Sequence, residues 1–326
     1  MAIKTRVSRN AASDFMGLRE AFYLFLEEKQ ANNLSQATLK SYEESFIKFM
    51  NFFEFDEETT TEEITQSLVF EWIGEMRLEN LTVNSINHYL RDIRAFFYWC
   101  MDDTRQYIKP MFKIKLLTVQ EEIPKCFPDE DLELLLDKPG KRESFSRWRI
   151  WAIVNWVLGT ANRASTICNV KIGDVDFKRK EISIRVTKNN KVQVLPLSSA
   201  LETALKEYIR MWRYGAPDDS YLFCNIGDDK LTTHALRQAF RKYCLNRGVN
   251  QTNIHGLRHN FARDWVRNEG NMFKLQQILG HATLDMTKKY VKLFCGDIKE
   301  DFDKFNPLDN IKRKAKRTQT VTRRDF

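Results

Sequence analysis

Apolar residues at helical spacing dominate the first hundred positions of the chain. Four such runs lie within residues 13–103, and each begins near residues that can cap a helix: Ser13 with Asp14, Ser35, Thr61 and Thr82. No stretch there alternates between apolar and polar residues as a half-buried strand does. The pattern therefore predicts a small helical bundle as an N-terminal domain.

Residues 104–126 lose this periodicity. They contain Pro110 and Pro124 together with scattered basic side chains. A basic segment bounded by prolines between two periodic regions is typical of an interdomain linker. Such a segment suits a crossing of a DNA backbone, and it equally suits an ordinary solvated connector.

From residue 127 to residue 295 the pattern mixes helices with one hairpin, as expected for a second domain. Residues 181–186 and 192–195 alternate apolar and polar positions around the turn 187–191, which predicts a β-hairpin. The pattern predicts further helices after Pro128 and near 144–158, 164–170, 198–213, 231–247, 255–268, 272–279 and 282–294, and a short strand at 221–224. The expected fold class is mainly α with a small β-hairpin or sheet.

The last segment, residues 296–326, differs from both domains. Phe302, Phe305, Pro307, Leu308 and Ile311 are apolar enough to dock on a surface. The stretch 311–324 then carries seven lysines and arginines and no acidic residue. Such a run is typical of a solvated or disordered end.

Composition narrows the class of protein. With 326 residues, 43% hydrophobic residues and 23 phenylalanines, the chain can bury a core in each of two domains. A net charge of +8 and a pI of about 9.1 favour a polyanionic partner. No apolar stretch approaches the roughly 18 residues of a membrane span, and no signal peptide is evident. The composition thus indicates a soluble protein of the cytoplasm.

The cysteines point to the same compartment. No two of them form a CxxC pair, so neither a zinc ribbon nor a thioredoxin-like motif is expected. Scattered cysteines in helical patterns are typical of reduced, mostly buried thiols. They stand at positions 100, 126, 168, 224, 244 and 295.

Tyr290 is the candidate nucleophile. A phenol with an ordinary pKa of about 10 can form a covalent bond to phosphorus once its proton is removed. Two arginines strengthen this interpretation, because guanidinium groups bind two oxygens of a phosphate at once and can replace a metal pair. Arg163 follows the small residues Gly159, Thr160 and Ala161 in a predicted tight turn.

The second arginine, Arg258, lies three residues after His255, so both are expected on one helical face. His255 and His259 also have the four-residue spacing of a zinc-binding pair. No glutamate lies between them, Arg258 would repel a cation and no third ligand is evident, so we expect no metal. His281 follows Gly280, where a missing side chain lets the backbone approach closely; an ordinary core histidine is the alternative.

Lys188 is the candidate general acid. A lysine in the hairpin turn can reach a bound substrate and protonate a departing oxygen. Lys191 lies in the same turn and is its rival, and turns of this kind often contain lysine and asparagine in any case.

Together these elements resemble the catalytic half of the tyrosine recombinase family, the phage integrases and Xer-type site-specific recombinases. The resemblance spans about residues 128–294 and rests on six separated elements in the family's order. They are Gly159-Thr160-Ala161-Asn162-Arg163-Ala164-Ser165, Asp174-Val175-Asp176, the hairpin from Thr187 to Leu197, His255-Gly256-Leu257-Arg258-His259, Leu279-Gly280-His281 and Tyr290. The N-terminal helices resemble the family's core-binding domain in length and pattern.

The resemblance implies a fold and a first set of roles. The core-binding bundle and the catalytic domain would form a C-shaped clamp around duplex DNA. Arg163 and Arg258 would hold the scissile phosphate. Lys188, in preference to Lys191, would be the general acid.

It also implies how the strand is cut. His255 would act as general base or proton acceptor, and His281 would hydrogen-bond the phosphate. Tyr290 would attack phosphorus and leave a 3′-phosphotyrosyl link and a free 5′-hydroxyl. Because that link keeps the bond energy, the reaction would need no ATP, metal or other cofactor.

Two departures from the family pattern concern the first arginine. The family usually has an acidic residue three positions after it, where this chain has Thr166. The usual Gly-Leu before it is Ala161-Asn162. Neither change removes a reacting group, but the support of Arg163 is expected to differ.

The partners implied by the resemblance are double-stranded DNA, as paired recombination sites, and further copies of this chain. Four protomers would assemble on two sites, with residues 302–311 docking on a neighbour and the basic end at 312–324 contacting phosphates. The protein would act in the cytoplasm on the nucleoid, encoded by a prokaryote, a virus or a mobile element. Two alternatives stay open: a type IB topoisomerase, and a non-catalytic DNA-binding regulator on the same fold.

Overall fold

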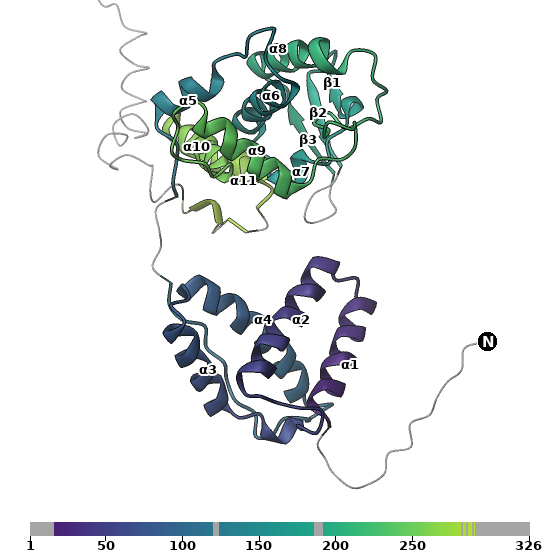
Figure 1. The fold of residues 1–326 in the computed structure, drawn as a ribbon, viewed down its shortest axis with the longest axis vertical. Helices are drawn as coiled ribbons and strands as arrows, with labels where there is room; N and C mark the ends of the chain where they lie inside the picture. Colours follow the sequence, from purple (N-terminus) through teal and green to yellow (C-terminus); the bar gives the residue numbers. More distant parts are fainter. Residues whose placement is uncertain are drawn as a thin grey trace, which may run out of the picture. The chain divides into compact units, whose positions relative to one another are not determined.

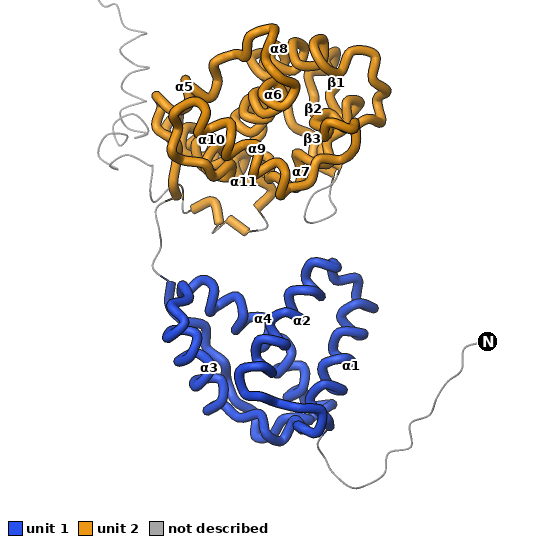
Figure 2. Tube along the Cα trace, in the orientation of Figure 1, with its two compact units in different colours: residues 1–121 blue, residues 122–326 orange. Residues whose placement is uncertain are grey.

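A computed structural model of the chain describes residues 16–119, 124–185, 192–281, 283–284, 286–288 and 290. The chain divides into two compact units, residues 1–121 and 122–326 (Figure 2). Each unit has its own hydrophobic core. The expected fold class, mainly α with a small sheet, is confirmed.

Four helices build the N-terminal unit: α1 (Leu18–Ala31), α2 (Gln36–Phe52), α3 (Gln66–Leu78) and α4 (Val83–Met101) (Figure 1). α4 contacts each of the other three helices. Side-chain oxygens of Ser35, Thr65 and Thr82 accept hydrogen bonds from backbone N–H groups at the starts of α2, α3 and α4. These caps satisfy donors that have no partner inside the helix, so local sequence sets where three of the helices begin.

Aromatic rings fill the core of this unit. Phe22 and Phe46 stack with their centroids 3.9 Å apart, and Phe96 meets both edge-on. Phe49 packs perpendicular to Trp72 at 5.1 Å. The edge-on arrangements of Phe96 and of Phe49 with Trp72 are favourable for aromatic quadrupoles. The many phenylalanines of the sequence therefore serve packing.

Two helix starts differ from the predictions. The first helix is capped by Gly17 and not by Ser13 or Asp14, which lie outside the described residues. The run from Thr61 is interrupted, because a 3₁₀ turn, η1 (Thr61–Glu63), precedes α3. The side chain of Glu63 reaches back to the backbone N–H of Thr60, which closes a capping box and starts this short turn separately.

The first part of the predicted linker belongs to the N-terminal unit. Ile108 and Ile114 are buried in its core. Asn87 binds the backbone of Leu117 in both directions, accepting from its N–H and donating to its carbonyl, each at 2.8 Å. Two apolar anchors and a double hydrogen bond thus hold this segment, whose irregular pattern alone indicated a free connector.

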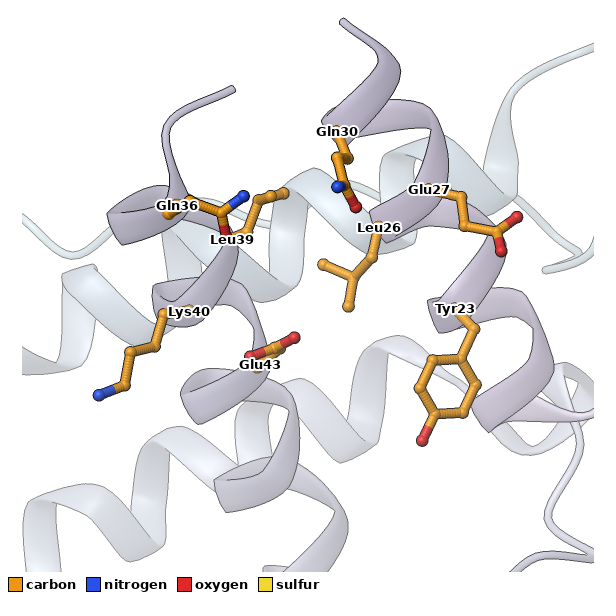
Figure 3. A pocket seen from close by; sticks show the side chains of 8 residues that line it. All are labelled: Tyr23, Leu26, Glu27, Gln30, Gln36, Leu39, Lys40 and Glu43. Carbon is orange, nitrogen blue, oxygen red and sulfur yellow. The ribbon is translucent and has the colours of Figure 1, made fainter. Parts of the chain in front are cut away.

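A groove of about 570 Å³ lies on the surface between α1 and α2 (Figure 3). Leu26 and Leu39 line it together with polar side chains. The charged residues of its lining are two glutamates, Glu27 and Glu43, and one lysine, Lys40. This negative balance does not suit a nucleic-acid backbone, so we assign no phosphate contact to the groove.

The C-terminal unit is built around α6 (Phe145–Thr160), which contacts α5 (Asp129–Leu136), α8 (Ser199–Tyr208), α9 (Thr233–Leu245) and α10 (His255–Arg267) (Figure 1). α6 is apolar on all sides, and ten of its residues are buried. A helix of that composition is stable only when neighbours cover its whole circumference. α6 is therefore the central helix of this unit.

Three antiparallel strands form the small sheet, in the order β1 (Val175–Asp176), β2 (Glu181–Ile184) and β3 (Gln193–Pro196). The predicted hairpin is confirmed as the β2–β3 pair, in which Glu181 lies opposite Pro196. β1 was not predicted as a strand, because two residues are too few for a period to be visible. The turn 186–191 lies outside the described residues.

The remaining elements connect these layers. They are α7 (Ala164–Ile167), the 3₁₀ turn η2 (Ile172–Asp174), the π-helical turn η3 (Ile209–Arg213) that continues α8, and α11 (Met272–Leu279). The strand predicted at 221–224 is wrong. Tyr221 and Cys224 each form only an isolated bridge, to Lys171 and Lys230, because no neighbouring strand runs alongside them.

Asn260 fastens the start of this unit to α10. Its side chain is fully buried and binds the backbone of Phe127 twice, accepting from the N–H at 2.8 Å and donating to the carbonyl at 2.7 Å. We expect Asn260→Ala to lower the free energy of unfolding by about 2–4 kcal/mol, because it leaves the buried N–H of Phe127 without a partner and the carbonyl with only a 3.3 Å hydrogen bond from Arg263. Chemical denaturation measures this.

Asn268→Ala is the matched control. Asn268 lies at the exposed end of the same helix, where its amide donates to Asp264 at 2.8 Å. Its loss is expected to cost less than about 1 kcal/mol, since water can replace the bond. Equal effects of the two substitutions would contradict the structural role given to Asn260.

Five cysteines are free thiols, four of them buried and Cys126 partly buried. Cys295 lies outside the described residues. Among the described helices, none is both long and apolar enough to cross a membrane.

Candidate active site

Arg163 lies where the chain leaves α6. α6 ends at Thr160, Ala161 adopts the left-handed conformation with φ 54°, and Arg163 is the N-cap of α7. The predicted tight turn is thus confirmed. Asn162 supports it, because its buried Oδ1 accepts a hydrogen bond from the indole N–H of Trp156 at 3.0 Å. Ala161 is the strained residue, since only glycine enters this conformation without cost.

Thr166 stands three residues after Arg163, at the position where the resemblance leads us to expect an acidic residue. Thr166 and Arg163 line the same groove. Within the described parts of the chain, the Arg163 guanidinium has no hydrogen-bonding or ion-pair partner. Its Nη1 lies 3.7 Å from the point that a Cβ on Gly280 would occupy. That distance is an ordinary van der Waals contact, so the feature that favours glycine at position 280 is its left-handed backbone, with φ 58°.

Arg258 is buried under the same groove, with 3% of its surface exposed. One guanidinium nitrogen donates to the carbonyl of Ala161 at 2.6 Å, and another donates to that of Leu279 at 2.7 Å. Burial, together with the charge of Arg163, lowers the pKa of Arg258 to about 10, so it stays charged at neutral pH. Arg258 thus joins the end of α6 to the end of α11 and places a fixed positive charge between them.

His281 follows the left-handed Gly280 that ends α11. Its Nε2 lies 3.1 Å from Arg258, and its Nδ1 lies 2.8 Å from the hydroxyl of Thr287, which is fully buried. Because a guanidinium can only donate, Nε2 is the acceptor and Nδ1 carries the proton. Both ring nitrogens therefore already have hydrogen-bond partners. His281 must exchange one of these partners before it can donate a hydrogen bond to a phosphate, which is the role predicted for it.

The pKa of His281 has a consequence for stability. Burial, Arg258 and Arg163 lower it to about 4, whereas an unfolded chain keeps the ordinary value near 6.5. Between these values the unfolded chain binds a proton that the folded protein does not. The stability contribution is complete above pH 6.5 and is lost as the pH falls toward 4.

We therefore expect His281→Gln to flatten the acid side of the stability profile. The difference in unfolding free energy between pH 7 and pH 4.5 should shrink by roughly 2 kcal/mol. Some slope should persist, because the pKa of His255 is also lowered. Denaturation curves at both pH values measure the difference, and an unchanged slope would contradict the assignment.

His255 and His259 lie one turn apart at the start of α10. Their rings meet edge to face with centroids 4.6 Å apart. His255 reaches solvent, yet packing around its ring, with the charges of His259 and Arg258, lowers its pKa to about 4. Burial likewise lowers the pKa of His259. Both imidazoles are therefore neutral at neutral pH.

Tyr290 lies beside His259 of its own chain. Its side chain is 5% exposed, and its hydroxyl lies 2.8 Å from Nδ1 of His259. The ring of His281 lies nearly parallel to it at 6.5 Å. Burial raises the pKa of Tyr290, although the charges of Arg258 and Arg163 act in the opposite direction. The phenol is therefore protonated at neutral pH and needs a base before it can attack.

A groove of about 1030 Å³ opens beside Arg258, and its lining does not include Tyr290, His255 or His259. Arg163, Arg258 and His281 line one part of it, and β3 lines another. The amide of Gln193 on β3 donates to the carbonyls of Gln277 at 2.6 Å and Ile278 at 3.2 Å. This ties the sheet to the end of α11. The site is thus held together by side chains from three separate stretches of sequence.

Lys188 and Lys191 lie outside the described residues. The strands that carry their turn do border the groove, through Ile184 on β2 and Val192 just before β3. Their choice as general acid accordingly stays a prediction.

A metal site finds no support in the described part of the chain, which contains no cluster of three or more His, Cys, Asp or Glu residues. His259 has the spacing of a zinc ligand, but its Nδ1 contacts Tyr290. Of the two histidines, His259 is therefore the one in contact with the phenol.

Three side chains of the site were missed by the sequence analysis: His259 as a partner of Tyr290, Thr287 and Gln193. The position of His259 beside Arg258 in the motif was the one signal that could have identified it. Thr287 and Gln193 act on other protein groups, and their contacts depend on which segments meet in space.

Comparison with known proteins identifies two family models along the chain. Residues 125–295 match the phage integrase family, and residues 20–103 match the phage integrase N-terminal SAM-like domain. These ranges agree closely with the two periodic regions of the sequence.

Curated relatives match along most of the chain. The tyrosine recombinase XerA of Pyrococcus furiosus is 26% identical over 295 residues, which cover 89% of this chain and 94% of the relative. The tyrosine recombinase XerC of Listeria monocytogenes is 25% identical over 301 residues, covering 89% and 97%.

Solved structures share the fold. The Tn1549 transposon integrase in complex with circular intermediate DNA has a TM-score of 0.65 at 20% identity, covering 84% of this chain and 95% of that one. The XerH site-specific recombinase bound to palindromic difH substrate, a post-cleavage complex, has a TM-score of 0.65 at 21% identity, covering 83% and 81%.

Proposed function

This chain belongs to the phage integrase family and is a site-specific tyrosine recombinase; from that premise we propose that it cuts and rejoins DNA through Tyr290. One observation carries the proposal. The buried hydroxyl of Tyr290 contacts an imidazole and lies within the electrostatic reach of Arg258 and Arg163. A nucleophile, a nearby base and two cations are what metal-free phosphoryl transfer requires.

The two arginines would hold the scissile phosphate. Arg258 is fixed by two backbone carbonyls, and Arg163 lies beside it at the groove with its fork available. The negative charge that develops on the non-bridging phosphate oxygens would be stabilised by the two guanidinium groups, which are already in position. We expect no metal or other cofactor to be needed.

The other groups would move protons. Lys188 would protonate the departing 5′-oxygen. The resemblance gives the role of general base or proton acceptor to His255. His281 would bind the phosphate once a proton sits on Nε2, which requires Arg258 to release that nitrogen and the hydroxyl of Thr287 to donate to Nδ1. The product is a 3′-phosphotyrosyl link and a free 5′-hydroxyl. Attack by the 5′-hydroxyl of a partner strand would reverse the step and complete the exchange without ATP.

The partner is double-stranded DNA. Paired recombination sites and a tetramer of this chain are the assembly we propose, with residues 302–311 docking on a neighbour and the basic end at 312–324 contacting phosphates. Both segments lie outside the described residues. The protein would act on the nucleoid in the cytoplasm of a prokaryotic cell, in a chromosomal or mobile-element context.

A covalent trapping experiment tests the proposal. Purified protein is incubated with a pool of duplexes that have a random core, and protein–DNA adducts that survive denaturant are isolated and sequenced. We expect adducts joined through Tyr290 to a 3′-phosphate at one preferred sequence. Failure of the wild-type protein to form any adduct on such a pool, or on DNA flanking its own gene, would overturn it.

A type IB topoisomerase is the alternative with the same chemistry. It relaxes supercoils alone and does not exchange strands between sites. A plasmid with two copies of the recovered sequence separates the two. Recombination between the copies supports the proposal, whereas relaxation without recombinant products supports the topoisomerase.

A further inference from the structure

We propose that His259, and not His255, is the group that takes the proton from Tyr290 when the phenol attacks DNA. The inference rests on the proposed function and assigns a further catalytic residue to it. His255 holds the motif position from which that role was expected. His259 is the residue whose ring nitrogen touches the reacting oxygen.

Geometry carries the first step. Nδ1 of His259 lies 2.8 Å from Oη of Tyr290, within the range expected of a general base and its proton. The two residues are 31 positions apart, and the phenol is 5% exposed. The ring of His255 instead meets the ring of His259 edge to face, one turn nearer the start of α10 and open to solvent.

The direction of the hydrogen bond follows from the states of both groups. Burial raises the pKa of Tyr290 and lowers that of His259, so a neutral phenol meets a neutral imidazole. The tautomer with its proton on Nε2 leaves a lone pair on Nδ1, which lets the phenol donate. The phenolic proton, which must leave during attack, therefore already lies in a hydrogen bond to its acceptor, Nδ1 of His259.

The step balances as follows. The phenolic O–H bond breaks, its proton passes to Nδ1, and the oxygen's electron pair forms the bond to phosphorus. The bond from phosphorus to the 5′-oxygen breaks, and that oxygen leaves with the electron pair and takes a proton from the general acid. The positive charge of Arg258 disfavours the new imidazolium, so His259 readily returns the proton when a 5′-hydroxyl reverses the reaction.

Isosteric substitution separates proton transfer from positioning. In His259→Asn the side-chain amide can occupy the place of Nδ1 and keep a hydrogen bond to Tyr290, but it cannot take a proton. Adduct formation is measured on a nicked duplex that carries the sequence cleaved by the wild-type protein. We expect a fall in the cleavage rate of roughly 10²–10⁴-fold. A rate within about threefold of wild type would overturn the proposal.

Chemical rescue distinguishes the two histidines. In His259→Ala the space left beside Tyr290 can admit free imidazole, which should restore part of the cleavage rate. The matched variant His255→Ala, one turn away on the same helix, should show no such rescue. Rescue of His255→Ala alone would assign the proton to His255 and overturn the proposal. Unfolding midpoints and DNA affinity of each variant show that the protein is folded and bound.

A measurement without DNA tests the contact itself. Nitrogen NMR of histidine-labelled protein should show His259 neutral, with Nδ1 unprotonated and its signal shifted by Tyr290→Phe. A proton on Nδ1 would overturn the proposal. Absence of any wild-type adduct would instead defeat the proposed function, while this measurement would still decide the direction of the hydrogen bond.

Discussion

Replacement of Tyr290 by phenylalanine is expected to abolish the covalent protein–DNA adduct. The substitution removes one oxygen, which is the only atom of that side chain able to bond to phosphorus. We expect cleavage to fall by at least about 10⁴-fold, the scale of losing a nucleophile from an active site. The measurement is adduct formation on a nicked duplex that carries the recovered sequence.

The rest of the protein should change little. The lost hydrogen bond to His259 is expected to cost about 1 kcal/mol of unfolding free energy. DNA affinity should stay close to that of the wild type, because the two arginines remain. The matched control is Tyr243→Phe, in which another buried hydroxyl loses its bond to the carbonyl of Leu135. That variant should still form adducts. A Tyr290→Phe protein that cleaves normally would show that another residue is the nucleophile.

Arg258→Ala carries the second large effect, and it should act on both stability and cleavage. The change leaves the carbonyls of Ala161 and Leu279 without their donor inside the protein, which we expect to cost about 3 kcal/mol of unfolding free energy. It also removes the fixed positive charge that we propose lies beside the scissile phosphate. Cleavage should fall by roughly 10²–10³-fold or more.

Arg163→Ala is the comparison that separates these effects. Arg163 is partly exposed, and its guanidinium has no hydrogen-bonding partner among the described residues. Its loss should reduce cleavage on a similar scale and change the unfolding free energy by less than about 1 kcal/mol. Denaturation curves and adduct kinetics on both variants test the pair. Equal destabilisation by the two substitutions would contradict the bracing role given to Arg258.

The two arginines are also held differently, and this bears on the presence of Thr166 where the family usually has an acidic residue. The family pattern led us to expect altered support of Arg163, and no carboxylate partner lies beside it in the described part of the chain. Arg258 is held by main-chain oxygens that no side-chain substitution removes directly. The two arginines proposed to bind the phosphate thus differ: Arg258 is held by two backbone carbonyls, and Arg163 has no hydrogen-bonding partner within the described residues.

Helix caps and periodicity are local properties, and the sequence alone was enough to determine them. Ser35 and Thr82 start helices where predicted, because the N–H groups that their hydroxyls satisfy lie within a few residues. Pro128 precedes α5 as predicted, with its fixed φ suited to a helix start. The hairpin was visible for the same reason, since alternation and a polar turn are features of adjacent positions. The order of the motifs was sufficient to indicate the family.

Only the tertiary structure decided which side chains meet. Spacing placed His255 and Arg258 on one face of a helix, but α10 buries Arg258 and leaves His255 exposed, because α6 and α11 cover one part of that face only. It also brought Tyr290 to His259, and it packed Ile108 and Ile114 of the predicted linker into a core. A periodic pattern predicts which face of its own helix a side chain lies on. The residues that pack against that face come from segments distant in sequence, and a local pattern contains no information about them.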